Sequence, residues 1–272
     1  MRRVRWWSAV WSSCSNPFEP DALMIDGRAT GNRLCRRLMS GMLLTALLAA
    51  GTFADAADTD ARQPLESTRS HEFYFTRGIY GGSFEDEDWG PRWAVDYPKA
   101  DQQFLVALKR LSRVDAPASE HALELSAPEL LDYPFLYMLE VGALSLDEEQ
   151  ARALRHYLLA GGFLVIDDFW GDWDWENFET QMARVFPEFD IVEIPLDHPV
   201  FHAFYDIGEV LQVPNVHQAS GGPTHEQGGR IPYVRGIFDN RGRLMVLINW
   251  NTDLGDAWEW ADAPYYLSLI HI

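Results

Sequence analysis

Runs of apolar residues alternate along the chain with amphipathic segments. Phe135–Leu139 and Phe163–Asp167 are apolar almost throughout, as expected of strands buried on both faces. Between them, Ser145-x-x-Glu148 predicts a capped helix that Gly161-Gly162 ends. A strand, a helix, a glycine turn and a second strand in this order predict a parallel β-α-β unit.

Shorter segments extend this pattern on both sides. Weaker apolar periodicity predicts a strand at Glu72–Thr76, a helix from Asp101 to Leu111, a strand at His121–Leu125, a helix at Trp175–Phe186 and a strand at Asp190–Ile194. Tyr233–Phe238 and Arg243–Asn249 flank Asp239-Asn240-Arg241-Gly242, which predicts a hairpin. We therefore expect a single α/β domain over residues 71–266: a mostly parallel sheet with helices on both faces and a late antiparallel hairpin.

The N-terminal region has the order of a cleavable signal peptide. Arg33, Arg36 and Arg37 precede the apolar run Leu38–Gly51, and Ala54-Asp55-Ala56 supplies a small-x-small cleavage site. Residues 1–56 are therefore expected to be an upstream extension and signal peptide, and residues 57–70 a disordered linker. We expect an exported protein, periplasmic or extracellular. At the other end, residues 267–272 resemble the translation of a sequencing adapter.

Cysteine positions and charge exclude several classes of function. Cys14 and Cys35 both precede the predicted cleavage site, so the exported domain would have neither a cysteine nucleophile nor thiolate metal ligands. The net charge of −19 repels nucleic acid and anionic lipid. The apolar run is too short to span a bilayer comfortably, so no stable membrane insertion is expected after cleavage.

Candidate ligand-binding residues follow from the geometry of open α/β sheets, in which ligands gather at the carboxyl ends of the strands. The residues at or beside predicted strand ends are Arg77, Tyr80, Trp89, Glu140, Asp168, Trp170, Asn249 and Asn251. Several tryptophans, including Trp170, Trp173 and Trp175, could form a platform for a sugar. The alternative is that these rings cover the core.

Two acids and two histidines are the candidates for catalysis. Asp167 and Asp168 could act as a paired carboxylate site, or could hydrogen-bond and cap locally. His198 and His202 lie four residues apart and could share a cation, although the glutamate of zinc proteases is missing between them. A helix start with Asp197 as N-cap also explains that motif.

A calcium site is a weaker candidate. Asp172, Asp174 and Glu176 alternate as acids do in calcium loops, but the glycine and the distal glutamate of such loops are absent. Acids at a helix start also complement the helix dipole. No cofactor is predicted, and a divalent cation stays an alternative.

Four motifs together resemble domain-of-unknown-function family 4159. They are F-Y-F-T-R-G-x-Y at Phe73–Tyr80, W-x-x-D-Y-P at Trp93–Pro98, G-G-F-L-V-I-D-D-F at Gly161–Phe169 and D-H-P-V-F at Asp197–Phe201. The resemblance implies a flavodoxin-like fold of the class I glutamine amidotransferase-like group, with no established activity. Amidotransferases of that group carry a cysteine after a central strand, where this chain has Asp168, so cysteine-dependent amide hydrolysis is not expected.

Three hypotheses on function follow. The first is a non-catalytic module that binds a small molecule or protein partner, with carbohydrate suggested by the tryptophans and by sugar-binding relatives of the fold group. The second is a hydrolase that uses carboxylates or a metal at the strand ends. The third is an envelope scaffold whose acidic surface meets a basic partner protein.

Overall fold

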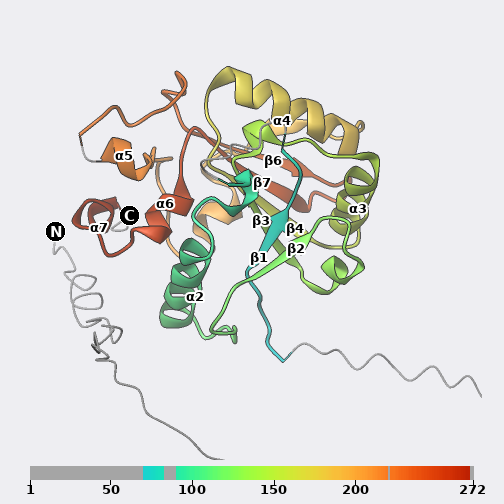
Figure 1. Ribbon diagram of the computed structural model, residues 1–272, viewed down its shortest axis with the longest axis horizontal. Helices are drawn as coiled ribbons and strands as arrows, with labels where there is room; N and C mark the ends of the chain where they lie inside the picture. Colours follow the sequence, from blue (N-terminus) through green and yellow to red (C-terminus); the bar gives the residue numbers. More distant parts are fainter. Residues whose placement is uncertain (1–69, 83–89, 220, 270–272) are drawn as a thin grey trace, which may run out of the picture. The chain divides into compact units, whose positions relative to one another are not determined.

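A computed structural model describes residues 70–82, 90–219 and 221–269, which build one sheet flanked by helices (Figure 1). The predicted extension and signal peptide, the predicted linker apart from Ser70, Trp89 and residues 270–272 lie outside these ranges. Among the described residues, no helix combines the length and apolar character needed to cross a membrane.

The sheet has seven strands in the order β2-β1-β3-β4-β7-β6-β5. Five neighbouring strands are parallel: β2 (His121–Glu124), β1 (Thr76–Ile79), β3 (Phe135–Leu139), β4 (Phe163–Asp167) and β7 (Leu244–Trp250). The strand β6 (Tyr233–Phe238) runs antiparallel between β7 and β5 (Ile191–Glu193). The predicted fold is therefore confirmed: a mostly parallel, flavodoxin-like sheet with a late hairpin.

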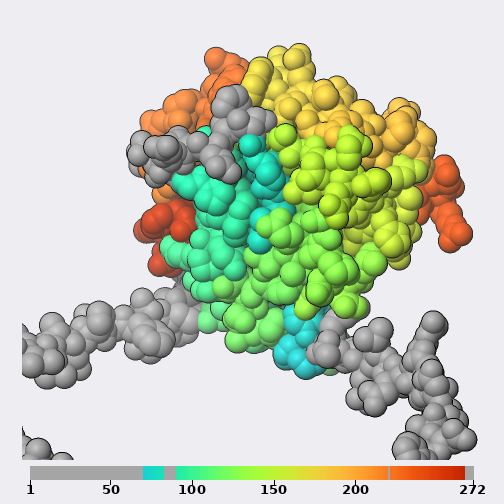
Figure 2. Space-filling view, turned by 45° about the vertical axis from the view of Figure 1, so that its right-hand side comes forward, coloured from blue at the N-terminus to red at the C-terminus, as the bar shows by residue number. Residues whose placement is uncertain are grey.

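Helices cover both faces of the sheet. The helices α3 (Glu148–Leu159) and α4 (Gly171–Val185) pack on one face, and α2 (Lys99–Leu111) and α6 (Leu254–Glu259) pack on the other. In Figure 2, α2 in teal and α3 in yellow-green lie on either side of the cyan segment that contains β1. The shorter elements are α5 (Val216–Ala219), α7 (Pro264–Leu269), η1 (Arg92–Ala94), η2 (Pro128–Asp132), η3 (Val141–Ala143) and η4 (Pro199–His202).

Alternation along the strands divides the core into two layers. In β3, Leu136 and Met138 pack in the α3 and α4 layer, whereas Tyr137 and Leu139 pack in the α2 layer. This period of two explains the unbroken apolar run in the sequence, because a central strand needs apolar side chains on both faces.

Several element boundaries differ from the prediction, and α4 begins at Gly171 instead of Trp175. The first strand begins at Thr76 instead of Glu72, because the N–H groups of Glu72 and Phe73 both donate to Asp115 O, at 3.0 Å, and not to a neighbouring strand. The cap of α3 is Asp147 instead of Ser145: its carboxylate accepts from Gln150 N at 2.7 Å. Arg77 consequently lies inside β1 and not in a loop after it.

Candidate functional site

The carboxyl ends of β3, β4 and β7 meet at one edge of the sheet. Glu140 N donates to Asp168 O at 2.9 Å, and Asp168 N donates to Thr252 O at 3.2 Å. The strands are parallel, so the residues that follow them gather at this edge. Glu140, Asp168 and Asn251 have left-handed φ values of 53°, 48° and 62°, which turn the chain sharply as it leaves each strand.

A polar pocket of about 200 Å³ lies at this edge. Its lining includes Arg92, Glu140, Trp170, Trp173, Asp174, Glu226 and Gln227. Trp173 is 58% exposed and therefore presents an aromatic surface beside three carboxyl groups. Burial raises the pKa of Glu140 to about 7, although Arg92, whose Nη1 lies 3.5 Å from Glu140 Oε1, lowers it. Glu140 therefore holds a proton in part of the population at neutral pH.

The carboxylate of Asp174 forms one wall of this pocket and is held by hydrogen bonds and by close packing against Gly142. Asp174 Oδ2 accepts from Trp170 N at 2.9 Å and from Gln227 Nε2 at 3.1 Å. A Cβ on Gly142 would lie 2.2 Å from Asp174 Cγ, so only glycine leaves room for this carboxylate. The hydrogen bond from Gln227 joins the glycine-rich segment Gly221–Gly229 to the start of α4.

An acidic cluster lies beside the pocket. Carboxylate oxygens of Asp96, Asp168 and Asp253 lie within 4.8 Å of one another, and Asp96 forms a second such group with Asp256 and Glu259. Burial and, to a smaller extent, the neighbouring acids Asp256 and Glu259 raise the pKa of Asp96 to about 8. Asp96 Oδ2 is buried and has no hydrogen-bond partner among the described residues. Such a cluster has the chemistry to retain protons or to hold a divalent cation.

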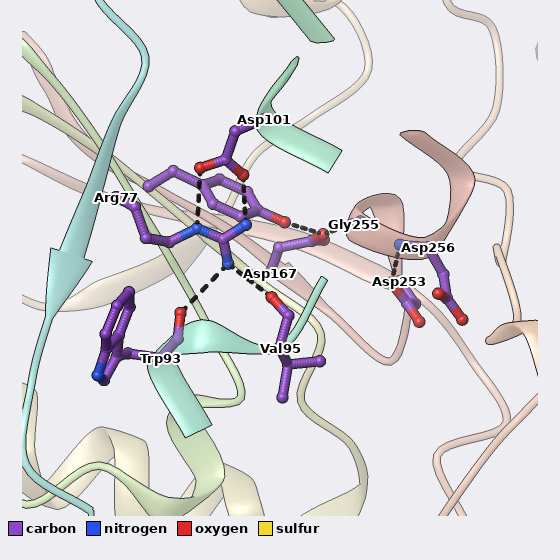
Figure 3. Close-up of polar contacts among 9 residues, drawn as sticks. Arg77, Trp93, Val95, Asp101, Asp167, Asp253, Gly255 and Asp256 are labelled. Atoms are coloured by element: carbon purple, nitrogen blue, oxygen red, sulfur yellow. Dashed lines mark hydrogen bonds and ion pairs between the residues drawn. The ribbon is translucent and has the colours of Figure 1, made fainter. Parts of the chain in front are cut away.

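A buried polar network of Arg77, Asp101, Tyr137 and Asp167 lies next to Asp253 and Asp256 of the acidic groups (Figure 3). Arg77 and Asp101 form a fully buried ion pair between β1 and α2, and Arg77 also donates to Val95 O at 3.1 Å. Asp167 Oδ2 accepts from Tyr137 Oη at 2.7 Å, from Leu254 N at 2.8 Å and from Gly255 N at 3.0 Å. Arg77 and Asp167 are both 0% exposed. Their hydrogen bonds therefore connect elements of the fold to one another and do not face solvent.

The other predicted ligand-binding residues lie in different surroundings. Tyr80 is buried and donates to Leu139 O at 2.6 Å. Asn251 Oδ1 accepts from Gly171 N at 2.8 Å, and its Nδ2 donates to Ile231 O at 2.8 Å. Asn249 lines a separate apolar cavity. Among the predicted residues that the structure describes, Glu140 and Trp170 line the polar pocket, and Trp170 Nε1 also donates to Asp168 Oδ1 at 2.8 Å.

The two histidines lie in and beside η4 and use their ring nitrogens locally. His198 Nδ1 accepts from Val200 N at 3.2 Å, so His198, not Asp197, is the N-cap. His202 contacts Asp206 Oδ1 at 3.0 Å and Leu196 O at 2.9 Å. Neither histidine belongs to a group of three or more metal-ligating side chains in the part of the chain described. The structure does not bring them into either acidic group.

The three calcium candidates lie on α4 and not in a loop. Asp174 is buried against Gly142, whereas Asp172 and Glu176 are exposed. Residues two apart on a helix point in different directions, so the three carboxylates do not converge on one point. The three tryptophans on and before α4 differ in exposure. Trp170 is 3% exposed and Trp175 packs against the core, whereas Trp173 is 58% exposed. Of these three, Trp173 therefore forms the exposed part of the predicted platform.

Sequence reasoning missed Arg92, Asp96, Glu226, Gln227, Asp253, Asp256 and Glu259 as site residues. The strand-end rule could have found Asp253, which lies three residues beyond β7. Asp96 stands within the W-x-x-D-Y-P motif. Nothing local distinguishes Glu226 or Gln227, because the fold alone brings their loop to α4.

Comparisons with known proteins support a family but not an activity. No curated protein matches the chain. The sequence profile of the domain of unknown function DUF4159 matches residues 80–269. That match covers most of the chain and six of the seven strands of the sheet, all but β1. The chain therefore belongs to the DUF4159 family.

Proposed function

We propose that the chain is a binding protein for a neutral, polyhydroxylated ligand such as a carbohydrate, and that the polar pocket is its site. The observation that carries the proposal is the exposed ring of Trp173 beside Glu140, Glu226 and Arg92 in one pocket. Carboxylates accept hydrogen bonds from sugar hydroxyls, a guanidinium donates to them, and an indole ring covers the apolar C–H face of a sugar.

Charge favours a neutral ligand over an anionic one. The chain carries 41 acidic and 22 basic residues, and the acidic cluster adjoins the pocket. An anionic ligand would meet repulsion that Arg92 alone does not offset. Export from the cytoplasm, predicted from the N-terminal segment, is part of this proposal and agrees with a role in binding environmental or envelope sugars.

Titration calorimetry of the full chain against neutral mono- and disaccharides tests the proposal. We expect saturable binding that weakens about fivefold in Trp173→Ala, since an aromatic contact contributes about 1 kcal/mol. Glu140→Gln should weaken binding as well. The matched control is Phe204→Ala, which removes an aromatic side chain of similar exposure, 59%, outside the pocket lining. Absence of binding to every sugar, or equal affinity in Trp173→Ala and the wild type, would contradict the proposal.

A second candidate function is glycoside hydrolysis at the same pocket, favoured by the raised pKa of Glu140. Glu140 would donate its proton to the leaving glycosidic oxygen. Glu226, whose Oε1 is hydrogen-bonded by Asn215 Nδ2, would take a proton from the attacking water. The C–O bond breaks as the water oxygen bonds to the sugar carbon. This assignment replaces Asp167, His198 and His202 as catalytic candidates, because none of them lines the pocket.

Aryl glycosides with a chromogenic leaving group distinguish binding from hydrolysis. Hydrolysis by the full chain that Glu140→Gln abolishes while sugar binding persists would support the enzyme. The alkaline limb of its rate profile should lie near pH 7, where Glu140 loses its proton. If the chain binds sugars but hydrolyses no aryl glycoside, the binding function stands and the proposal of glycoside hydrolysis is wrong.

A further inference from the structure

A separate apolar cavity of about 360 Å³ lies on the α2 and α6 face of the sheet. Its walls come from β6 and β7 (Val234, Leu247), from α6 and the turn before it (Leu254, Trp258), and from the segment after η4 (Phe201, Val213). None of its lining residues lines the polar pocket. The cavity therefore lies outside the site of the proposed function.

Hydrogen bonds hold the outer wall of the cavity in place. Val213 N donates to Thr252 Oγ1 at 3.0 Å, and Asp253 N donates to Val213 O at 2.9 Å. Gln212 Nε2 donates to Asn251 O at 3.0 Å. These bonds attach the segment to the end of β7, so the cavity is formed before any ligand arrives.

Asn249 contributes a polar side chain to this apolar lining. Asn249 lies on β7, shares a face with Leu247, lines the cavity and is 6% exposed. In the described ranges, no hydrogen bond reaches its side-chain amide, whereas the nearby Thr252 hydroxyl accepts from Val213 N. The Asn249 amide keeps a small accessible surface and lines the cavity, so it is available to hydrogen-bond with a polar group of a ligand there.

We propose that this cavity binds a compact, neutral, mostly apolar molecule that carries one hydroxyl or amide group, which hydrogen-bonds with Asn249. The cavity holds the volume of about 12 waters at ~30 Å³ each, which is within the range of small-molecule sites. Glu209 is the one ionisable side chain in the lining, and it is exposed. With no cation in the lining to pair with it, an anionic ligand is disfavoured.

Three probes of similar size test the proposal on the full chain: 3-phenylpropanol, the hydrocarbon butylbenzene, in which a methyl replaces the hydroxyl, and the anion 3-phenylpropionate. Ligand-observed NMR and thermal shift should show saturable binding of the alcohol, about tenfold tighter than that of the hydrocarbon, and no binding of the anion. The tenfold preference corresponds to one net hydrogen bond.

Two variants of the lining and one control complete the design. Asn249→Leu removes the amide at similar volume, so it should abolish the preference for the alcohol while the hydrocarbon still binds. Ala257→Leu should fill the cavity and abolish binding of both neutral probes. Trp173→Ala, which alters the polar pocket alone, should leave alcohol binding unchanged. Failure of the wild type to bind the alcohol, or an undiminished preference for it in Asn249→Leu, would overturn the proposal.

Discussion

Arg77 and Asp101 form a bidentate ion pair whose side chains are both 0% exposed. Arg77 Nε donates to Asp101 Oδ2 at 3.2 Å, and Arg77 Nη2 donates to Asp101 Oδ1. The guanidinium also lies 4.9 Å from the centre of the Tyr137 ring. The pair therefore joins β1 to α2 within the core layer on the α2 and α6 face of the sheet.

Removing one partner of this pair should destabilise the fold strongly. Asp101→Ala leaves a buried guanidinium without its carboxylate, and we expect a loss of about 3–5 kcal/mol in the free energy of unfolding, measured by urea denaturation. The matched control is Glu188→Ala, which breaks the exposed pair with Arg155 and should cost far less, because solvent screens that pair. Similar losses in the two variants would contradict a structural role for the Arg77–Asp101 pair.

Asp167 should act as an anchor for α6. Its Oδ2 satisfies the N–H groups of Leu254 and Gly255 and the Tyr137 hydroxyl. Asp167→Ala leaves all three donors unpaired and should cost roughly 2–5 kcal/mol, whereas Tyr137→Phe removes one donor and should cost about 1–2 kcal/mol. Hydrogen exchange at Leu254 and Gly255 should accelerate in Asp167→Ala. Unchanged protection there would show that α6 does not depend on this carboxylate.

Gly171 is a position where two distant segments of the chain approach each other closely beside the pocket. Its φ is +72°, and a Cβ there would lie 2.4 Å from Gln227 O. Gly171→Ala should therefore lower the free energy of unfolding by at least about 2 kcal/mol and displace Gln227 from the pocket wall. Gly208→Ala is the control, because nothing lies within 4 Å of its Cβ position, and we expect a change within about 0.5 kcal/mol.

Much of the fold was predictable because the sequence of each strand, helix or turn is enough to predict that element. The apolar run of β4, the capped helix before it and the Asp-Asn-Arg-Gly turn each encode their own structure. The position of Arg77 was predictable in principle, because it shares the strand face of Phe75 and therefore points into a buried layer. Sequence analysis misplaced it by ending the strand at Thr76, whereas β1 continues to Ile79.

The site was less predictable, because it depends on contacts between remote segments. Glu140 and Trp170 follow strands and obey the strand-end rule. Glu226 and Gln227 belong to a glycine-rich loop with no local signal, and they reach the pocket because Asn251 bonds Gly171 and Gln227 bonds Asp174. Asp96 precedes α2 and meets Asp168 and Asp253 only after the sheet has formed.

The acidic cluster should make stability fall as pH rises. Burial and the neighbouring acids raise the pKa of Asp96 from 3.8 to about 8, so the folded state retains a proton that the unfolded state loses. This contribution is fully present below about pH 4 and is lost as pH rises to about 8. Asp167, whose pKa burial raises to about 6, adds a loss of the same sign between about pH 4 and 6.

Asp96→Asn should therefore gain Tm relative to the wild type at pH 8 and much less at pH 5. A gain of about 2–4 °C would correspond to ~1 kcal/mol for a domain of this size. Asp262→Asn removes an exposed acid and serves as the control for the change in net charge. Because a bound divalent cation would neutralise the cluster, the measurement should be made with chelator and repeated with added Mg²⁺ or Ca²⁺. A Tm difference between Asp96→Asn and the wild type that stays constant from pH 5 to pH 8 in chelator would show that Asp96 does not retain the proton.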